Sequence, residues 1–354
     1  DTDRSRGLGD VYKRQVTNRV YGQLQDDISK DIYKARVLNS ITYDYNYITQ
    51  IAVDGLDIFK YLREQLKPFI EKKTKLILDG AGYYGRSIKR TLDDIHFECF
   101  SDGNPNQDTI MGIPVISRRE AVLKYKDALF VITSMVYDKQ IKKELEQLGV
   151  KYILDFGAYL NKNSTIRDNQ YYDIFKFNDD EVIADVGCYD CYTTKQYFKC
   201  VTEKYKRIYS FEPEPEQFVK CKKIIEDGQY PNWEIFNYGV CDNNGKLYFS
   251  SNSSCSKISQ DGDLEVNVIK LDDFFKTHEP PTFIKMDIEG SELVALKGCT
   301  EIISKYKPKL AICVYHKPED IFEIPEFILS LNSDYKMWLR HYTNLVNETV
   351  LYCE

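Results

Sequence analysis

The stretch Glu181-Val-Ile-Ala-Asp185-Val-Gly187-Cys-Tyr-Asp190 decides the fold of this 354-residue chain. Its apolar first half predicts a buried strand, and the acid and the glycine that follow predict a tight turn into a helix. Ligands of open α/β sheets bind at the carboxyl ends of the strands, where small residues let them approach the backbone. The loop at Gly187 is therefore a candidate binding site.

The next predicted strand, Arg207–Phe211, is followed by Glu212, which lies 25 residues after Gly187. A carboxylate at this place can accept hydrogen bonds from both hydroxyl groups of a ribose. The loop lacks the G-x-G-x-x-G pattern and the lysine that cradle a diphosphate. Together these features suit a nucleoside cofactor without phosphate, and S-adenosylmethionine is such a molecule.

Strand-like runs continue the pattern at residues 233–236, 283–286 and 310–315, and helical runs separate them, notably residues 291–307. Two β-like runs, residues 335–340 and 349–352, close the chain. Alternating strands and helices predict a mainly parallel sheet, and the closing hairpin adds an antiparallel edge.

Four groups of residues in this half of the chain resemble the FkbM-type methyltransferases. They are Asp185-Val-Gly187-Cys-Tyr-Asp190, Phe211-Glu212-Pro213, Lys285-Met-Asp287-Ile-Glu289-Gly290-Ser-Glu292, and a tail with His316, Arg340-His341-Tyr342 and Glu348-Thr-Val-Leu-Tyr352. The resemblance covers residues 180–354 and implies a class I, seven-stranded S-adenosylmethionine-dependent fold that O-methylates sugars, polyketides or related natural products. The family pattern usually has glycine where this chain has Cys191, whose side chain would either crowd the methionine tail or point away.

Asp185, Gly187 and Glu212 match the cofactor motif of the family. Tyr189 and Asp287 are further candidate cofactor-binding residues, and Asp287 is expected to face the methyl donor and the substrate. The alternative interpretation is a tight turn followed by a surface carboxylate. Strand alternation puts Lys285 on the same face as Asp287, either as a catalytic residue or as the partner that neutralises the carboxylate. Glu289 is expected to stabilise the helix that starts near Ser291 through its charge.

Methyl transfer to an oxygen requires an acceptor hydroxyl held close to the donor, and removal of its proton. His316 directly follows the fifth strand and, with an ordinary pKa of about 6.5, is a candidate catalytic base. A structural histidine with satisfied hydrogen bonds is the alternative, and Asp287 is the rival base. A divalent metal held by Asp287 and its neighbours would also acidify the hydroxyl, although no metal site is predicted.

A similar strand–loop–helix unit occurs earlier, within residues 75–160. A strand at 75–78 leads through Asp79 to Gly80, Gly82 and Gly85, and Asp102 ends the next strand 20 residues after Gly82. This spacing is typical of dinucleotide-binding loops. The unit resembles the nucleotide-sugar-binding amino-terminal domain of bacterial sugar acyltransferases. The implied ligand is a nucleotide-sugar, NAD is the alternative, and a Rossmann unit kept only for docking is the third interpretation.

The remaining segments complete the expected organisation. Residues 1–15 are interpreted as a non-native or disordered leader, residues 16–74 as a helical segment broken at Pro68, residues 161–179 as a polar linker, and residues 180–354 as the methyltransferase domain. The expected fold is α/β, with two Rossmann-like domains in series.

Composition limits the classes of partner. The net charge of −7 argues against nucleic acid, and a hydrophobic content of 43% excludes intrinsic disorder for most of the chain. No apolar run reaches the roughly 20 residues of a membrane span, and a cytoplasmic protein is expected. The ten cysteines are expected to be buried free thiols. The one C-x-x-C pair, Cys188 and Cys191, lacks the second pair or nearby histidine of a zinc site.

The expected function is S-adenosylmethionine-dependent methylation of a hydroxyl group on a sugar, a glycan precursor or a related natural product, as in polysaccharide biosynthesis. One alternative is a non-catalytic nucleotide-sugar-binding or scaffold protein in which Cys191 blocks the cofactor. The other is an NAD-linked enzyme, against which stands the lack of a Tyr-x-x-x-Lys dyad within residues 75–160.

Overall fold

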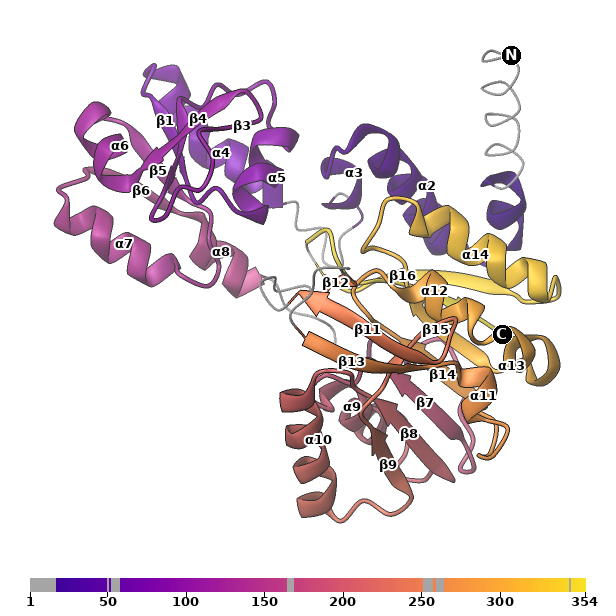
Figure 1. The fold of residues 1–354 in the computed structure, drawn as a ribbon. Coiled ribbons are helices and arrows are strands. Elements are labelled where there is room, and N and C mark those ends of the chain that lie inside the picture. The colour runs from indigo at the N-terminus through magenta and orange to yellow at the C-terminus, as the bar shows by residue number, and fades with distance from the viewer. Residues whose placement is uncertain are drawn as a thin grey trace, which may run out of the picture. The chain divides into compact units, whose positions relative to one another are not determined.

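The computed structural model describes residues 17–49, 51, 58–163, 169–250, 257–258, 264–343 and 345–354. The chain forms two units (Figure 1). The larger unit takes the chain up to residue 37 together with residues 166–342 and 347–354, and the smaller unit takes residues 38–165 and 343–346. The predicted leader, residues 1–15, lies outside the described residues.

A seven-stranded sheet with the order β16-β17-β15-β14-β7-β8-β9 forms the centre of the larger unit. Its strands are β7 (Val182–Val186), β8 (Arg207–Phe211), β9 (Trp233–Phe236), β14 (Phe283–Met286), β15 (Lys309–Cys313), β16 (Met337–His341) and β17 (Thr349–Cys353). Strand β17 is antiparallel to both of its neighbours, whereas the other neighbouring pairs are parallel. The predicted methyltransferase-like sheet with a closing antiparallel hairpin is confirmed.

The register of the central strands determines where the binding loops start. Lys285 of β14 lies beside Asp185 of β7, and Val186 lies beside Phe211 of β8. Because these strands are parallel, the loops after β7, β8 and β14 all begin at one edge of the sheet.

Aromatic packing covers one face of this sheet. Helices α9 (Tyr192–Cys200) and α10 (Pro215–Gly228) enclose it together with Tyr171, Tyr172 and Phe175. Tyr172 lies edge-on to Tyr197 of α9, with the ring centroids 5.6 Å apart. These rings occupy much of the segment interpreted from the sequence as a linker, so residues 169–175 belong to the core of the unit.

The single helix predicted for residues 291–307 is two helices, α12 (Glu292–Lys297) and α13 (Thr300–Tyr306). The interruption lies at Gly298, where a Cβ atom would be 2.0 Å from the carbonyl oxygen of Cys241. The close approach of these two backbones accounts for the break. Helices α11 (Leu271–Phe274) and α14 (Asp320–Leu331) complete the helices of this part of the chain.

A second, four-stranded sheet has the order β10-β13-β11-β12. Its strands are β10 (Gly239–Val240), β11 (Gly245–Ser250), β12 (Lys257–Ile258) and β13 (Leu264–Ile269). The sequence analysis did not predict this sheet. It matters for the site because Leu247 of β11 and Val268 of β13 line the cavity described below.

Residues 17–37, which include the start of helix α2 (Asp27–Thr42), lie along the edge strand β16. Leu24 forms a parallel bridge with Met337, and Asp26 makes an ion pair with Arg340 at 2.7 Å. The Ser29 hydroxyl accepts the backbone N–H of Leu339 at 2.9 Å. This segment therefore covers an edge that would otherwise be open.

The smaller unit contains a six-stranded sheet with the order β3-β4-β2-β1-β5-β6, in which β3 is antiparallel to β4 and the other pairs are parallel. Its strands are β1 (Leu76–Asp79), β2 (Cys99–Asp102), β3 (Thr109–Ile110), β4 (Ile113–Ser117), β5 (Leu129–Ile132) and β6 (Tyr152–Asp155). Two hydrophobic clusters cover its two faces, because Leu76 and Leu78 belong to one and Ile77 belongs to the other.

The helices of the smaller unit divide between these faces. Helices α4 (Ile58–Glu71), α5 (Tyr83–Thr91) and α8 (Phe156–Asn163) contribute to the first cluster, and α6 (Arg118–Lys124) and α7 (Asp138–Gln147) contribute to the second. The predicted break at Pro68 is wrong, because α4 runs through it. Leu66 and Phe69 pack into the first cluster on either side of the proline, and this burial offsets the missing backbone donor.

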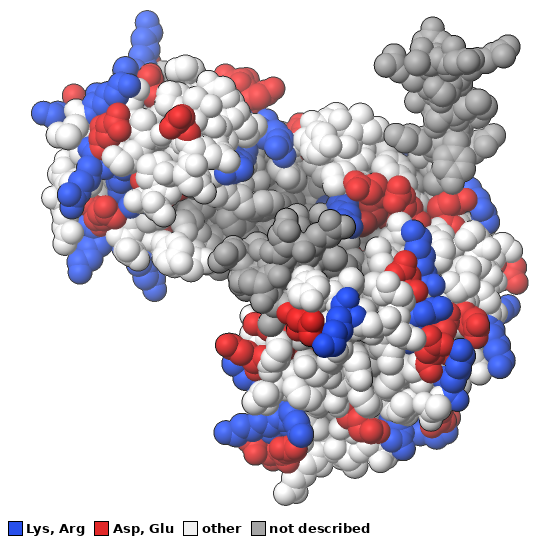
Figure 2. Space-filling model, viewed as in Figure 1, with Lys and Arg blue, Asp and Glu red and all other residues white. Residues whose placement is uncertain are grey.

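Acidic and basic side chains are interspersed on the faces of the units that Figure 2 shows. Of the helices in the described part of the chain, none is long and apolar enough to cross a membrane.

Candidate functional site

A cavity of about 620 Å³ opens at the carboxyl ends of β7, β8 and β14 in the larger unit. Its walls include the loop from Gly187 to Asp190, Glu212 after β8, and Asp287 and Glu289 after β14. The cavity therefore lies where the sequence analysis placed the cofactor.

Gly187 occupies a position that only glycine tolerates. Its φ is +80°, and a Cβ atom there would lie 2.0 Å from the carbonyl oxygen of Asp287. The loop after β7 thus packs closely against the backbone of Asp287 and the side chain of Ile288 in the loop after β14. The predicted importance of a small residue at the end of β7 has this direct steric cause.

Glu212 is buried and lines the cavity. One of its carboxylate oxygens accepts the backbone N–H of Tyr189 at 3.0 Å, and the other accepts that of Glu214 at 2.9 Å. Burial raises the pKa of Glu212 to about 7, although these two hydrogen bonds counteract the effect. The contact of Tyr189 with this acid is made through its backbone.

Asp185, a predicted cofactor ligand, does not line the cavity. It is buried behind the cavity wall, where it makes an ion pair with Lys285 at 3.0 Å and accepts a hydrogen bond from the Thr194 hydroxyl. Lys285 also donates to the carbonyl of Gly187 at 2.6 Å. Burial lowers the pKa of Lys285, but the charges of Asp185 and Asp287 and the hydrogen bond to Asp185 together raise it. Lys285 is thus the neutralising partner of a carboxylate, but the carboxylate is that of Asp185.

Asp287 presents its carboxylate to the cavity from just beyond the end of β14. One oxygen accepts the hydroxyl of Tyr171 at 2.9 Å, and the other lies 3.5 Å from Nε2 of His316. Because the strand has already ended at Met286, strand alternation no longer separates Asp287 from Glu289. Both residues line the same cavity.

His316 lies among three carboxylates. Its Nδ1 is 3.0 Å from Glu292, and its Nε2 is 3.5 Å from both Asp287 and Glu289. Burial lowers the pKa of His316, but the hydrogen bond and charge of Glu292 and the charges of the other two acids raise it to about 9. The imidazole is therefore protonated at neutral pH, unlike the ordinary histidine assumed in the sequence analysis. Asp287, Glu292 and His316 each offer one possible metal-ligand atom within 4.8 Å of the others.

The acid in the first turn of α12 is Glu292, where Glu289 was expected to act through its charge. The Glu292 carboxylate accepts the backbone N–H groups of Ile288 and Gly290 at 2.9 and 3.3 Å. Glu289 has a φ of +56° and directs its charge to His316.

Three further residues of the site were missed. Tyr171 holds Asp287, and Gln170 donates to Glu348 at 2.7 Å while Tyr315 donates to the same carboxylate at 3.1 Å. Glu348 and Tyr315 line the cavity. Tyr171 and Gln170 lie in the segment interpreted as a linker, so no local pattern indicated their role.

Two residues of the tail that carried the family resemblance make structural contacts. Arg340 pairs with Asp26, and Nδ1 of His341 lies 2.9 Å from the hydroxyl of Thr349.

Cys191 points away from the cavity. Its φ is +60°, and its side chain is fully buried in the aromatic core next to Cys188 and Cys221. The left-handed conformation explains why glycine suits this position. The side chain therefore does not crowd a ligand in the cavity.

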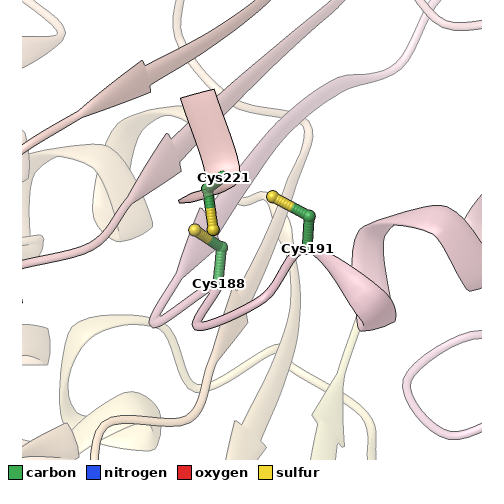
Figure 3. A group of neighbouring side chains, drawn as sticks. All are labelled: Cys188, Cys191 and Cys221. Atoms are coloured by element: carbon green, nitrogen blue, oxygen red, sulfur yellow. The ribbon is translucent and has the colours of Figure 1, made fainter. Parts of the chain in front are cut away.

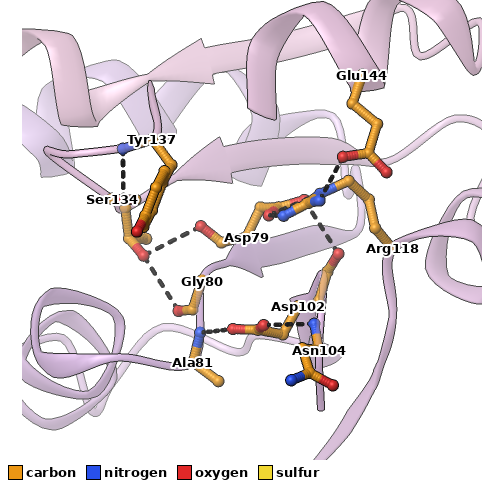
Figure 4. Close-up of polar contacts among 11 residues, drawn as sticks. Asp79, Gly80, Ala81, Asp102, Asn104, Arg118, Ser134, Tyr137 and Glu144 are labelled. Carbon is orange, nitrogen blue, oxygen red and sulfur yellow. Dashed lines mark hydrogen bonds and ion pairs between the residues drawn. The ribbon is translucent and has the colours of Figure 1, made fainter. Parts of the chain in front are cut away.

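The glycine loop of the smaller unit is closely packed (Figure 4). A Cβ atom at Gly80 would lie 2.5 Å from the hydroxyl of Thr133, and one at Gly85 would lie 2.0 Å from the carbonyl oxygen of Gly80. Gly82 differs, since no atom lies within 4 Å of its Cβ position. Asp102, the predicted ribose acid, accepts the backbone N–H groups of Ala81 and Asn104 at 2.9 and 3.0 Å.

A buried ion pair lies beneath this loop and was not predicted. Arg118 binds Asp79 at 2.8 Å and Glu144 at 2.7 Å, and the hydroxyl of Ser101 donates to Asp79 at 3.0 Å (Figure 4). Burial raises the pKa of Asp79 despite the contacts with Arg118.

Comparisons with known proteins address the larger unit. Residues 185–344 match the methyltransferase FkbM domain. The hexuronic acid methyltransferase AglP of Haloferax volcanii is 26% identical over 132 residues, which cover 35% of this chain and 52% of AglP. The chain thus matches about half the length of this curated relative.

Two solved structures align with this chain. Methyltransferase FkbM from Methylobacillus flagellatus aligns over 93% of this chain and 99% of its own, with 19% identity and a TM-score of 0.53. A putative methyltransferase from Streptococcus mutans, solved in complex with SAH, aligns over 55% of this chain and 93% of its own, with 14% identity and a TM-score of 0.32. Residues 185–344 thus match the methyltransferase FkbM domain, and the likeness to the Methylobacillus flagellatus structure concerns the fold.

Proposed function

We propose that the larger unit transfers a methyl group from S-adenosylmethionine to a hydroxyl oxygen of a sugar. The observation that carries this proposal is the carboxylate of Glu212, which is buried yet lies on the wall of a cavity of about 620 Å³.

The residues around the cavity fit this cofactor. Each oxygen of Glu212 accepts one backbone N–H, and a carboxylate oxygen has a second lone pair that can accept a ribose hydroxyl. Gly187 leaves no side chain between the two loops at the floor of the site. Gly187, Tyr189 and Glu212 would hold the nucleoside, and Asp287 would face the reacting end. When bound, the cofactor supplies a methyl group made electrophilic by its sulfonium.

Asp287 is our candidate for the group that removes the acceptor proton. It lines the cavity, and Tyr171 and His316 fix the orientation of its carboxylate. With its pKa raised to about 9, His316 carries a proton at neutral pH and counterbalances the surrounding acids. His316 would take part in proton removal only in its deprotonated form, at higher pH. Lys285 lines the cavity and holds Asp185 and the carbonyl of Gly187 in place.

The acceptor is proposed to be a sugar because AglP, the curated relative, is a hexuronic acid methyltransferase. Asp287, Glu289 and Glu348 all line the cavity. The negative charges of Asp287 and Glu289 would repel an anionic acceptor atom and favour a neutral hydroxyl. Burial and the charge of Asp287 raise the pKa of Glu348. Hydroxyl oxygens of a sugar or glycan precursor are thus the acceptor class that the site suits best.

Calorimetric titration of the full chain with S-adenosylmethionine tests the proposal. Glu212→Ala should weaken binding by about 1.5–3 kcal/mol, because it removes a charged acceptor of two hydrogen bonds. Glu216→Ala, an exposed acid of helix α10, is the matched control and should bind like the wild type. Equal affinity of the folded Glu212→Ala protein would remove Glu212 from the cofactor site. Methyl transfer to a panel of neutral and uronic sugars would then define the acceptor.

A further inference from the structure

Three cysteine side chains of the larger unit meet beside the cavity (Figure 3). Cys188 and Cys191 belong to the loop after β7, and Cys221 belongs to helix α10. Their sulfur atoms all lie within 4.8 Å of one another, and none of the three residues is more than 2% exposed. Figure 3 shows the three side chains grouped between the loop and the helix, with the sulfur of Cys191 directed toward Cys188 and Cys221.

The backbone of the loop is bent to produce this arrangement. The N–H of Cys191 donates to the carbonyl of Cys188 at 2.8 Å, which closes a turn. Tyr189 and Cys191 both have positive φ, at +50° and +60°. A left-handed backbone is unfavourable for a residue with a Cβ atom and would suit glycine. Retaining a cysteine there costs stability, and the sulfur that it adds is directed at two other thiols.

Thiols grouped in this way match the chemistry of thiophilic metal ions. Zinc binds thiolates at about 2.3 Å in tetrahedral geometry, which places pairs of sulfur atoms roughly 3.8 Å apart. The limit of 4.8 Å on the three pairs is compatible with this after a small adjustment. Thiolates are the metal-binding form of cysteine. The positive charges of Lys195 and Lys220 act on Cys221 and would partly compensate the charge of a thiolate cluster.

We propose that Cys188, Cys191 and Cys221 form a structural binding site for a thiophilic divalent cation such as Zn²⁺. Binding replaces three thiol protons with one divalent cation and leaves a single net negative charge, which the two lysines partly offset. The thiol of Cys221 donates a hydrogen bond to the carbonyl of Tyr189 at 2.9 Å, which metal binding would replace, and an oxygen ligand would fill the fourth position. The site does not depend on the methyl-transfer proposal.

The metal would fasten the binding loop to helix α10. Cys188 and Tyr189 line the cavity, and Tyr189 donates its N–H to Glu212. Fixing this loop before a ligand arrives reduces the ordering cost of binding. Removal of the metal should therefore weaken the binding of any ligand that contacts the loop. The loss of the metal itself is measured separately.

The test is a titration of the reduced, metal-free full chain with Co²⁺, whose thiolate complexes have a characteristic charge-transfer absorption. We expect the band to saturate at one equivalent and to disappear when Zn²⁺ displaces Co²⁺. Cys191→Gly is the decisive variant, because glycine adopts the observed φ freely and should preserve the fold. It should lose the band. Cys200→Ser replaces an exposed cysteine of helix α9 and should keep it.

Two measurements distinguish the loss of metal binding from the loss of the fold. Circular dichroism should show native secondary structure for Cys191→Gly, and Zn²⁺ should raise the melting temperature of the wild type but not of this variant. The proposal is overturned if no band forms, or if Cys191→Gly retains it. It is also overturned if peptide mapping of protein purified without chelator finds a disulfide between Cys188 and Cys191 in place of a metal.

Discussion

The two units each contain a strand, a glycine loop and an acid that ends the next strand. In both, a buried cation neutralises the acid of the first strand: Lys285 pairs with Asp185 at 3.0 Å, and Arg118 pairs with Asp79 at 2.8 Å. In both, the second acid accepts a backbone N–H from the loop, as Glu212 does from Tyr189 and Asp102 from Ala81.

The two loops differ in what surrounds them. Glu212 and Gly187 line a cavity of about 620 Å³. In the smaller unit, Gly80 and Gly85 are required by contacts with Thr133 and with each other. In both units the shared pattern connects a strand to a helix. We expect it to form a ligand site where the second acid also lines a cavity.

The largest expected effect tests the chemistry of the larger unit. Asp287→Asn should lower methyl transfer by about 10²–10⁴-fold, because the amide cannot take up a proton. Steady-state turnover with a chelator present and absent measures this and separates a base from a metal ligand. Asp227→Asn, an exposed acid at the end of α10, serves as the control. Full turnover of Asp287→Asn would end its role as the base and leave deprotonated His316 as the candidate.

A second experiment tests the difference between the two loops directly, by looking for a ligand that binds the smaller unit. Gly82 begins helix α5, and its Cβ position has no neighbour within 4 Å. If the loop holds a nucleotide-sugar, Gly82→Leu should reduce its binding by at least tenfold through steric exclusion, while the affinity for S-adenosylmethionine stays unchanged. Calorimetry with nucleotide-sugars and NAD provides the measurement. Wild-type protein that binds none of them would favour the docking interpretation.

Replacing each of three glycines with alanine compares the two loops in the absence of any ligand. Gly187→Ala and Gly85→Ala each place a Cβ atom 2.0 Å from a carbonyl oxygen, so each should destabilise its unit by about 1–3 kcal/mol. Gly82→Ala should change stability by less than about 0.5 kcal/mol. Denaturant unfolding followed by peptide-resolved hydrogen exchange assigns each loss to a unit. An equally large loss for Gly82→Ala would contradict the steric explanation.

The smallest expected effect is a pH dependence at Glu212, whose folded pKa is about 7 because of burial. A carboxyl group with a raised folded pKa contributes stability below its unfolded pKa of about 4.5, and this contribution is lost as pH rises through 7. Cofactor affinity should change in the opposite sense, rising severalfold through pH 7 as the carboxylate forms. Glu212→Gln should bind weakly with a flat profile, and a wild-type profile that is also flat would exclude this group.

Sequence reasoning located the sheet and the cavity because the strand–glycine–acid pattern is local. It also identified Gly187, Glu212 and Asp287 as wall residues. It misplaced Asp185, because an acid at a strand end can point behind the wall as easily as into it. Tyr171, Glu348 and Cys221 depend on contacts between segments far apart in the chain, and no spacing rule reveals these. The raised pKa of His316 likewise arises from three acids that only the folded loops bring together.

The covering of strand β16 by residues 17–37 has a practical consequence for domain dissection. The FkbM match begins at residue 185, which invites expression of the matched region alone. Such a fragment would lack Leu24, Asp26 and Arg36, which contact Met337, Arg340 and Thr349. Its edge strand would be uncovered, and Thr349 would lose its buried partner Arg36. Uncovered edge strands pair with other copies. The larger unit is therefore discontinuous in sequence, and a soluble fragment would have to retain the amino-terminal segment or receive it from a second peptide.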